Sequence, residues 1–99
     1  MVRKVIWSAS AKADKMEILK YWKARNKPNI YSKKLNLLFK ESVSLISKTP
    51  GTGHITIKEN FRVKVVRDYL IIYELTMDAV HILSIFDGRR NPEEFNKRL

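Results

Sequence analysis

Arg62 and Lys64 place two cations close together in the segment FRVKVV, residues 61–66, which otherwise has the alternating apolar pattern of a β-strand. Side chains two apart on a strand lie on one face, about 7 Å from each other. Alternation predicts a core face beneath helices and an open cationic face: Phe61, Val63 and Val65 on the first, Arg62, Lys64 and Val66 on the second. A cationic row suits the phosphates of a single-stranded nucleic acid and would offset charge on a phosphorane. An ordinary solvent-facing strand has the same pattern, so the pair alone favours neither interpretation.

Arg89 and Arg90 add two cations directly after the last expected strand, in FDGRRNP. Gly88 lets the backbone turn sharply there. An arginine at a strand end is well placed for a bidentate grip on phosphate or carboxylate. For one of the two, the favoured alternative is an ion pair with a neighbouring carboxylate: Asp87, Glu93 or Glu94.

His81 lies within an expected strand, and histidine titrates near neutral pH, so it is a candidate general acid or base. Alternation groups it with Leu83 and Ile85, which have the character of a core face. A partly buried, hydrogen-bonded histidine is therefore favoured over a catalyst. His54 follows the Gly51–Gly53 loop and is expected to be exposed.

Tyr69 and Tyr73 share one face of their strand. Stacking on an RNA base is one role for such a pair. Core or edge packing is the favoured alternative.

Composition excludes several kinds of site. The chain has no cysteine and two histidines, which removes disulfides and thiolate nucleophiles and argues against a structural metal. No glycine-rich phosphate loop, nucleophilic serine elbow or HExxH motif is present, and we expect no cofactor. The formal net charge of +10 favours nucleic acid, an acidic protein or an anionic surface as partner. A solvated basic surface without a specific partner is the alternative.

The elements that position these residues can be read along the chain. A strand is expected at 2–7, and Ser8 or Ser10 can cap a helix that ends near Arg25. A second helix is expected over about 29–48, with Pro28 in its first turn. The remaining strands are expected at 54–58, 61–66, 69–75 and 79–86.

This order, βααββββ, predicts a single α+β domain over residues 1–99, with an N-terminal strand and an antiparallel meander packed on a helical hairpin. Such a sheet can leave its other face exposed. Apolar runs fall short of the roughly 18 residues of a membrane span, and the charged N-terminus is unlike a signal peptide. We therefore expect a cytoplasmic protein that does not enter a membrane.

Four segments together resemble the RelE/ParE superfamily of bacterial toxins over about Lys4 to Pro92: YWKARN, YSKKLNLLFK, NFRVKVVRDYLIIYEL and ILSIFDGRRNP. The resemblance implies a toxin of a type II toxin–antitoxin pair, neutralised by a partner that wraps its surface. RelE-like members cut mRNA in the ribosomal A site without a metal, using lysines, arginines and a tyrosine. ParE-like members share the fold, lack most of that set and inhibit DNA gyrase.

The resemblance carries over to single residues in part. Arg62 and Lys64 match two basic residues of RelE-like toxins, and Arg89 or Arg90 matches an arginine after the last strand. Two other positions depart from the RelE-like pattern. Where that pattern has an arginine just after a tyrosine, this chain has Leu70, and the pattern's tyrosine near the C-terminus falls near Phe95. Arg67 is a candidate replacement for the arginine, and His81 or Tyr73 for the proton donor.

Three functions follow. The first, which we take as the leading interpretation because of the basic residues on the strand, is a ribosome-dependent mRNA endonuclease that uses Arg62, Lys64, Arg67 and Arg89 or Arg90. The second is a ParE-like gyrase inhibitor without ribonuclease activity, which the two substitutions favour. The third is a non-toxic homologue that binds an antitoxin. In each case we expect an antitoxin that is acidic at its contact and covers part of the Arg62 and Lys64 face or the helical hairpin.

Overall fold

The computed structural model describes residues 3–25, 30–49, 54–55 and 61–89, and confirms an α+β domain with the expected element order. Its strands are β1 (Lys4–Trp7), β2 (His54–Ile55), β3 (Phe61–Val66), β4 (Tyr69–Leu75) and β5 (Ala79–Asp87). Its helices are α1 (Ala9–Arg25) and α2 (Ile30–Lys48). Residues 56–58, Pro28, Arg90 and Phe95 lie outside the described residues, as does the side chain of His54.

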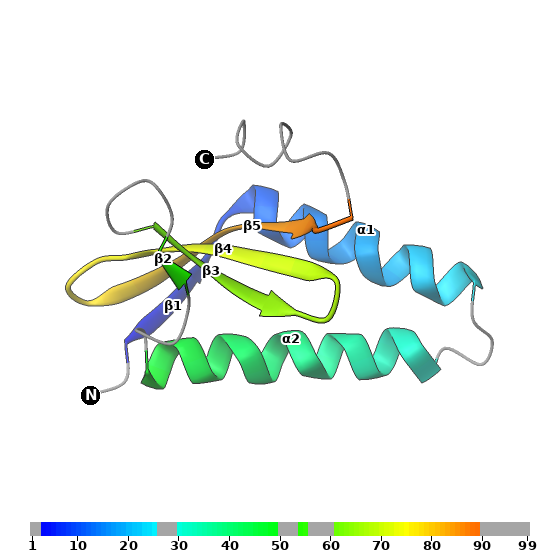
Figure 1. Ribbon diagram of the computed structural model, residues 1–99, viewed down its shortest axis with the longest axis horizontal. Helices are drawn as coiled ribbons and strands as arrows, with labels where there is room; N and C mark the ends of the chain where they lie inside the picture. The colour runs from blue at the N-terminus through cyan, green and yellow to red at the C-terminus, as the bar shows by residue number, and fades with distance from the viewer. Residues whose placement is uncertain (1–2, 26–29, 50–53, 56–60, 90–99) are drawn as a thin grey trace.

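The five strands form one sheet in the order β1-β5-β4-β3-β2. The meander from β2 to β5 is antiparallel, as expected, whereas β1 pairs with β5 in parallel. The helical hairpin is the crossover that returns the chain from β1 to the opposite edge. Both helices extend beyond the sheet at one end of the molecule (Figure 1).

Ser8 begins α1 and also ties it to the sheet. Its hydroxyl oxygen accepts a hydrogen bond from the backbone N–H of Ala11 at 2.9 Å, which is the N-cap geometry. The same hydroxyl donates to the carbonyl of Leu83 on β5 at 2.9 Å. The cap therefore fixes where α1 starts relative to the central strands.

The main core lies between the helices and the sheet. Its largest fully buried side chains come from α2, β4 and β5: Leu35, Phe39, Ile46, Ile71, Tyr73, Val80 and Ile82. A second, smaller buried cluster contains Val63, Ile72 and Phe86. Apolar side chains are thus buried on both faces of the sheet.

This two-sided burial corrects the predicted orientation of β3. Lys64 pairs with Ile71, and Arg62 with Tyr73, and both partners belong to the helix-facing core. Val63 belongs instead to the second cluster. Arg62, Lys64 and Val66 therefore face the helices, and the prediction that they form the open face is wrong. Alternation fixes which residues share a face, but it cannot name the face when both bury apolar groups.

A β-bulge interrupts the pairing of β4 with β5. Ile72 pairs with Ser84 and Tyr73 with Ile82, so Leu83 is passed over. The bulge brings both Ile82 and Ile85 into the helix-facing core. His81, next to Ile82, consequently does not share a face with Ile85, which corrects the predicted grouping.

Candidate functional site

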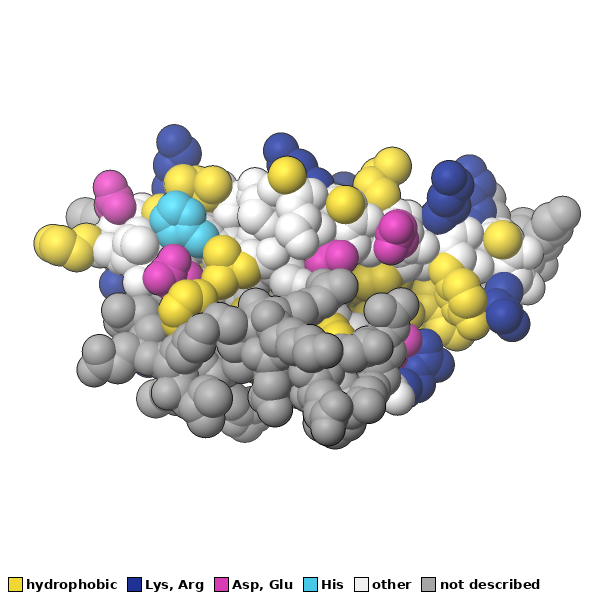
Figure 2. All heavy atoms as spheres, turned by 90° about the horizontal axis from the view of Figure 1, so that it is seen from above, with side chains coloured by type: hydrophobic (Ala, Val, Ile, Leu, Met, Phe, Trp, Pro, Cys, Tyr) yellow, Lys and Arg dark blue, Asp and Glu magenta, His cyan; other side chains and the backbone are white. Residues whose placement is uncertain are grey.

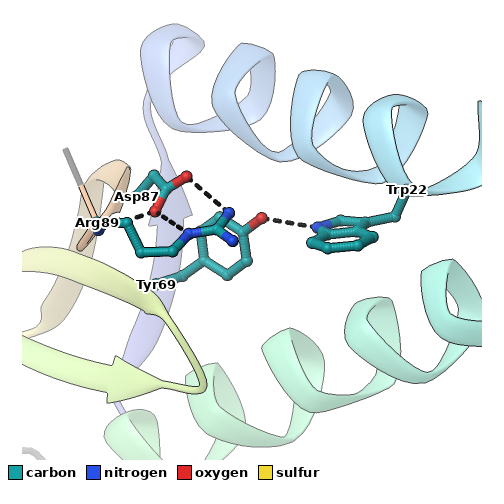
Figure 3. Close-up of polar contacts among 4 residues, drawn as sticks. All are labelled: Trp22, Tyr69, Asp87 and Arg89. Atoms are coloured by element: carbon teal, nitrogen blue, oxygen red, sulfur yellow. Dashed lines mark hydrogen bonds and ion pairs between the residues drawn. The ribbon is translucent and has the colours of Figure 1, made fainter. Parts of the chain in front are cut away.

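Arg89 forms a closed ion pair with Asp87 at the end of β5 (Figure 3). Its Nε donates to Asp87 Oδ1 and its Nη2 donates to Oδ2, each at 3.0 Å. The backbone N–H of Arg89 also donates to Oδ1 at 3.0 Å. These hydrogen bonds raise the pKa of the guanidinium above its usual value. The expected ion pair is confirmed for Arg89. Its guanidinium makes the bidentate contact with a carboxylate of its own chain, Asp87.

Gly88 sits beneath this pair because no side chain fits there. Its N–H donates to the carbonyl of Asp68 at 2.7 Å, and a Cβ at this position would lie 2.9 Å from that carbonyl oxygen. Its φ is not positive. The glycine is therefore needed for close approach to the β3–β4 turn, and not for the sharp turn that the sequence suggested.

Tyr69 lies beside Arg89 and links the hairpin to α1. Its hydroxyl accepts a hydrogen bond from Trp22 Nε1 at 2.7 Å (Figure 3). Burial raises the pKa of this hydroxyl, and Asp87 adds to the effect, whereas the Trp22 bond and Arg89 oppose it. At neutral pH the phenol is therefore protonated, and its oxygen is a structural acceptor.

Neither tyrosine offers a ring face to a base. Tyr69 is 3% exposed and Tyr73 is fully buried. The ring of Tyr69 also meets Phe39 edge-on, with centroids 5.8 Å apart. Base stacking needs an accessible ring face, so the structure supports the core-packing interpretation.

A concavity of about 290 Å³ lies where α1 meets the start of β4 and the end of β5. Its polar lining is mostly acidic, with Asp14, Glu17 and Asp87 against the guanidinium of Arg89. The walls are otherwise aromatic or aliphatic: Ile18, Tyr21, Tyr69, Ile85 and Phe86. Three carboxylates around one neutralised cation do not make a phosphate site.

Asp14 in this concavity has a structural role that its sequence context did not reveal. Its Oδ2 accepts hydrogen bonds from the backbone N–H of Ile85 at 3.0 Å and from the hydroxyl of Ser84 at 2.9 Å. Both donors lie just after the bulge, where strand pairing shifts register. A charged acceptor on α1 thus satisfies groups that the bulge displaces.

A second hollow, of about 340 Å³, separates α2 from the end of β3 and contains two of the candidate cations. Lys64 and Arg67 line it. Arg67 is exposed and occupies the β3–β4 turn with φ of 57°, a left-handed conformation that few residues other than glycine adopt. The two hollows share no lining residue. The turn that carries Arg67 nevertheless contacts the segment that carries Arg89, because the N–H of Gly88 donates to the carbonyl of Asp68.

Arg62 lines neither hollow. Its Nε is buried and has no hydrogen-bond partner among the residues that the structure describes, although the residue as a whole is half-buried. The long aliphatic stem explains how a cation can occupy a helix-facing position near the edge of the sheet, since its charged end can reach outward.

His81 also lines neither hollow. It is half-buried between neighbouring strands, opposite Glu74 on β4 and Ile6 on β1. The favoured interpretation, a partly buried histidine within the sheet, fits this position. The other histidine, His54 of β2, pairs through its backbone with Val63, which lies between Arg62 and Lys64.

Charge is dispersed over the surface. On the face drawn in Figure 2, Lys and Arg side chains occupy separate positions, with acidic side chains between some of them. Within residues 3–25, 30–49, 54–55 and 61–89, no group of three His, Asp or Glu side chains could hold a metal. No helix in the same ranges is long and apolar enough to cross a membrane.

Comparison with known proteins identifies the family. Residues 5–92 match the family model described as the ParE toxin of the type II toxin–antitoxin system parDE. The chain belongs to the ParE toxin family. The resemblance to RelE/ParE toxins is thereby confirmed, and the protein is a type II toxin–antitoxin toxin by family.

The fold of this ParE-family toxin matches a solved structure described as the chromosomal ParDE TA system from P. aeruginosa. The TM-score is 0.74 at 16% identity, over 87% of this chain and 96% of the other. At this identity the match shows the shared fold alone. No curated protein matches the chain.

Sequence reasoning on this ParE-family chain missed residues whose roles depend on partners distant in sequence. Trp22 bonds a hydroxyl 47 positions away, and Asp14 bonds groups 70 and 71 positions away. The position of Asp14 is a signal for such a role: it lies three residues after Ala11 and four before Ile18, on the apolar stripe of α1, and a carboxylate on a buried stripe requires donors.

Proposed function

We propose that this ParE-family toxin inhibits growth by binding a protein target, DNA gyrase, and not by cutting mRNA. RelE-like cleavage, as the resemblance describes it, needs several basic groups and a tyrosine around one RNA segment. ParE-like inhibition needs a complementary surface and no acid–base pair. The proposal takes the second of the functions that the sequence left open.

The observation that supports binding most directly is the ion pair that holds the guanidinium of Arg89 against Asp87. Arg89 is neutralised by Asp87 beside an acidic concavity, whereas Lys64 and Arg67 line a different hollow. The two rings proposed for RNA contact are buried. A guanidinium whose N–H groups are directed at a carboxylate is a weak stabiliser of a phosphorane, because electrostatic stabilisation requires donors directed at the reacting atom.

The proposal includes a cognate antitoxin. The matched structure is described as a ParDE system, which pairs a ParE with a ParD component by its printed name. For a toxin of +10 net charge, we propose an antitoxin whose contact surface is acidic, because complementary charge speeds and selects association. Toxin, antitoxin and gyrase would then meet in the cytoplasm.

Two measurements on one induced culture test the mechanism. We expect plasmid supercoiling and DNA-damage signalling to change while the 5′ ends of mRNA stay as they are without induction. Purified toxin should inhibit supercoiling by gyrase in a reaction that contains no ribosomes. New mRNA 5′ ends within translated frames, with normal supercoiling, would overturn the proposal in favour of mRNA cleavage.

Alanine variants refine the same test. Under RNA cleavage, Arg62→Ala or Lys64→Ala would abolish new RNA ends with folding intact. Under the proposed mechanism neither variant produces or removes RNA ends. Growth that is unaffected by expression of the folded wild-type chain would instead indicate a non-toxic, antitoxin-binding homologue.

A further inference from the structure

One face of α2 is turned toward α1 and β1, and this face carries Lys40. The hydroxyl of Ser32 donates to the carbonyl of Leu19 on α1 at 3.0 Å. The hydroxyl of Ser47 donates to the carbonyl of Arg3, directly before β1, at 2.6 Å. Lys40 lies eight residues after Ser32 and seven before Ser47, spacings that keep the three side chains on one face of a helix. Lys40 therefore lies on the side of α2 that meets α1 and β1.

Lys15 reaches the same place from the neighbouring helix. It lies one turn before Leu19 on α1, and α1 and α2 run in opposite directions (Figure 1). Its Nζ lies over the ring of Trp7, the last residue of β1, at 5.2 Å from the ring centroid. This distance is that of a cation–π contact, which fixes the position of the ammonium group. We call Trp7, Lys15 and Lys40 together the two-lysine site.

The two ammonium groups of this site are close enough to repel each other. Burial lowers the pKa of Lys15 below its ordinary value, and the positive charge of Lys40 lowers this pKa further. Neither lysine forms an ion pair with another of the described residues. The carboxylates of the two helices lie elsewhere, since Asp14 and Glu17 line the concavity at the end of β5 and Glu41 lines the hollow beside β3. Like charges held together in this way favour the entry of an anion.

We propose that the two-lysine site binds a backbone phosphate of duplex DNA. Lys15 meets the phosphate from α1 and Lys40 meets it from α2, so that one anion removes the repulsion between the two ammonium groups. The assignment to DNA rests on the proposed function, because gyrase acts on DNA and a toxin bound to gyrase lies close to that DNA. The phosphate chemistry itself follows from the two lysines.

The choice of lysine favours a DNA phosphate over a carboxylate of a partner protein. Lysine is depleted from protein–protein interfaces, whereas lysine and arginine supply many of the contacts to the DNA backbone. An ammonium group binds phosphate as a point charge and does not need the bidentate geometry that arginine offers to a carboxylate. The formal net charge of +10 adds a long-range attraction to a polyanion. The same net charge opposes a second copy of this chain as the occupant.

The test is the affinity of the purified toxin for a short DNA duplex, measured by fluorescence anisotropy over a range of salt concentrations. Lys40→Gln removes one charge from an exposed side chain, so the fold should be unaffected. We expect the dissociation constant to rise about five- to tenfold at about 0.1 M salt, and the slope of log affinity against log salt to become shallower by about 0.9, the value for one phosphate contact. Lys20→Gln, an exposed change on α1, is the matched control and should leave the slope unchanged.

Two variants of Lys15 separate its charge from its packing on Trp7. Lys15→Arg keeps the positive charge, and should bind DNA within about twofold of the wild-type chain. Lys15→Gln loses the charge, and should lose as much affinity and salt slope as Lys40→Gln does. Circular dichroism melts identify any variant that fails to fold, and the exposed Lys40→Gln keeps the test decisive if Lys15→Gln is such a variant.

The outcomes separate this inference from the proposed function, because DNA affinity is measured without gyrase. Folded Lys40→Gln that binds DNA with the affinity and salt slope of Lys20→Gln overturns the inference, whether or not the toxin inhibits gyrase. Loss of affinity for the protein encoded beside the toxin gene, with DNA affinity intact, identifies a carboxylate as the ligand and also overturns the inference. A toxin that binds DNA through this site but leaves supercoiling by gyrase unchanged overturns the proposed function and supports the phosphate site.

Discussion

The indole of Trp22 donates a hydrogen bond to the hydroxyl of Tyr69 at 2.7 Å, and so joins the far part of α1 to the start of β4. Trp22 also meets Tyr31 of α2 edge-on, with centroids 4.7 Å apart. Tyr69 in turn contacts Phe39 of α2. The two helices and the β3–β4 hairpin are thus held by one polar contact within an aromatic cluster, next to the Asp87–Arg89 pair (Figure 3).

Removing the Tyr69 hydroxyl should destabilise the fold. Tyr69→Phe leaves the half-buried indole N–H of Trp22 without its acceptor, and we expect a loss of about 1–3 kcal/mol in the free energy of unfolding. Urea denaturation followed by circular dichroism measures this quantity. Tyr21→Phe is the control, because Tyr21 is 45% exposed, and it should shift stability by less than about 0.5 kcal/mol. Equal stability of the two variants would mean that the Trp22 bond contributes nothing.

The same hydroxyl should make the protein sensitive to alkali. Burial raises the pKa of Tyr69 in the folded state above its ordinary value of 10.0. As the pH rises through 10, the unfolded chain loses this proton while the folded chain keeps it, so the unfolded state binds fewer protons and stability falls. The fall begins near pH 10 and ends only above the raised pKa of the folded state.

Titration of unfolding free energy between pH 8 and pH 11 tests this sign. Wild-type protein should lose stability more steeply above pH 10 than Tyr69→Phe does, whereas their slopes should coincide below about pH 9. Tyr21→Phe should follow the wild-type curve. A steeper loss in Tyr69→Phe would contradict the assigned direction of the pKa shift.

Asp14 should be essential to the β4–β5 bulge. Asp14→Ala removes the acceptor for the Ile85 N–H and the Ser84 hydroxyl, and Ser84 is 5% exposed, so water cannot easily replace the carboxylate. We expect a loss of about 2–4 kcal/mol, because hydrogen bonds to a charged group are involved and buried donors remain. Amide hydrogen exchange should also accelerate at Ile85. Glu17→Ala, an exposed neighbour in the same concavity, is the control and should change little.

The local sequence pattern was enough to predict the helices and strands, because the formation of each depends on residues that are close in sequence. The predicted β3 and β4 have the observed bounds, and β5 ends at Asp87, one residue beyond the predicted end. Of the two serines proposed as caps, Ser8 forms the N-cap of α1. These features follow from alternation, turn residues and capping chemistry, all of which act over a few positions.

The candidate site was predicted less well, because it depends on which face each strand turns to the helices. Arg62 and Lys64 were correctly predicted to share one face of β3, but the predicted face was wrong. A second buried cluster around Ile72 makes both faces of the sheet apolar, so the pattern could not distinguish them. The bulge at Leu83 then shifted His81 relative to Ile85, which no local pattern signals. The Asp87–Arg89 pair was foreseen as an alternative because its partners are adjacent in sequence.

A substitution of Arg62 tests whether this residue is kept for function or for the stability of the fold. Within the described part of the chain its buried Nε has no hydrogen-bond partner, and an unsatisfied buried group costs about 1–3 kcal/mol. Met keeps the aliphatic stem and brings no polar atom that needs a donor, so Arg62→Met should increase the free energy of unfolding by about 1 kcal/mol. Lys64→Met, on the same face of β3, removes an equal charge without relieving a buried donor and should be close to neutral.

The toxicity of Arg62→Met then distinguishes the two mechanisms, because only RNA cleavage predicts that the more stable variant loses its toxicity. If Arg62 acts on RNA, the stabilised Arg62→Met protein loses growth inhibition, because catalytic groups are commonly kept at a cost in stability. Under the binding mechanism proposed here, Arg62→Met is both more stable and still able to inhibit gyrase supercoiling. Growth assays with the two variants at matched expression, read beside urea denaturation, distinguish these results. A variant that is more stable yet inactive against growth and gyrase would make Arg62 part of the functional surface.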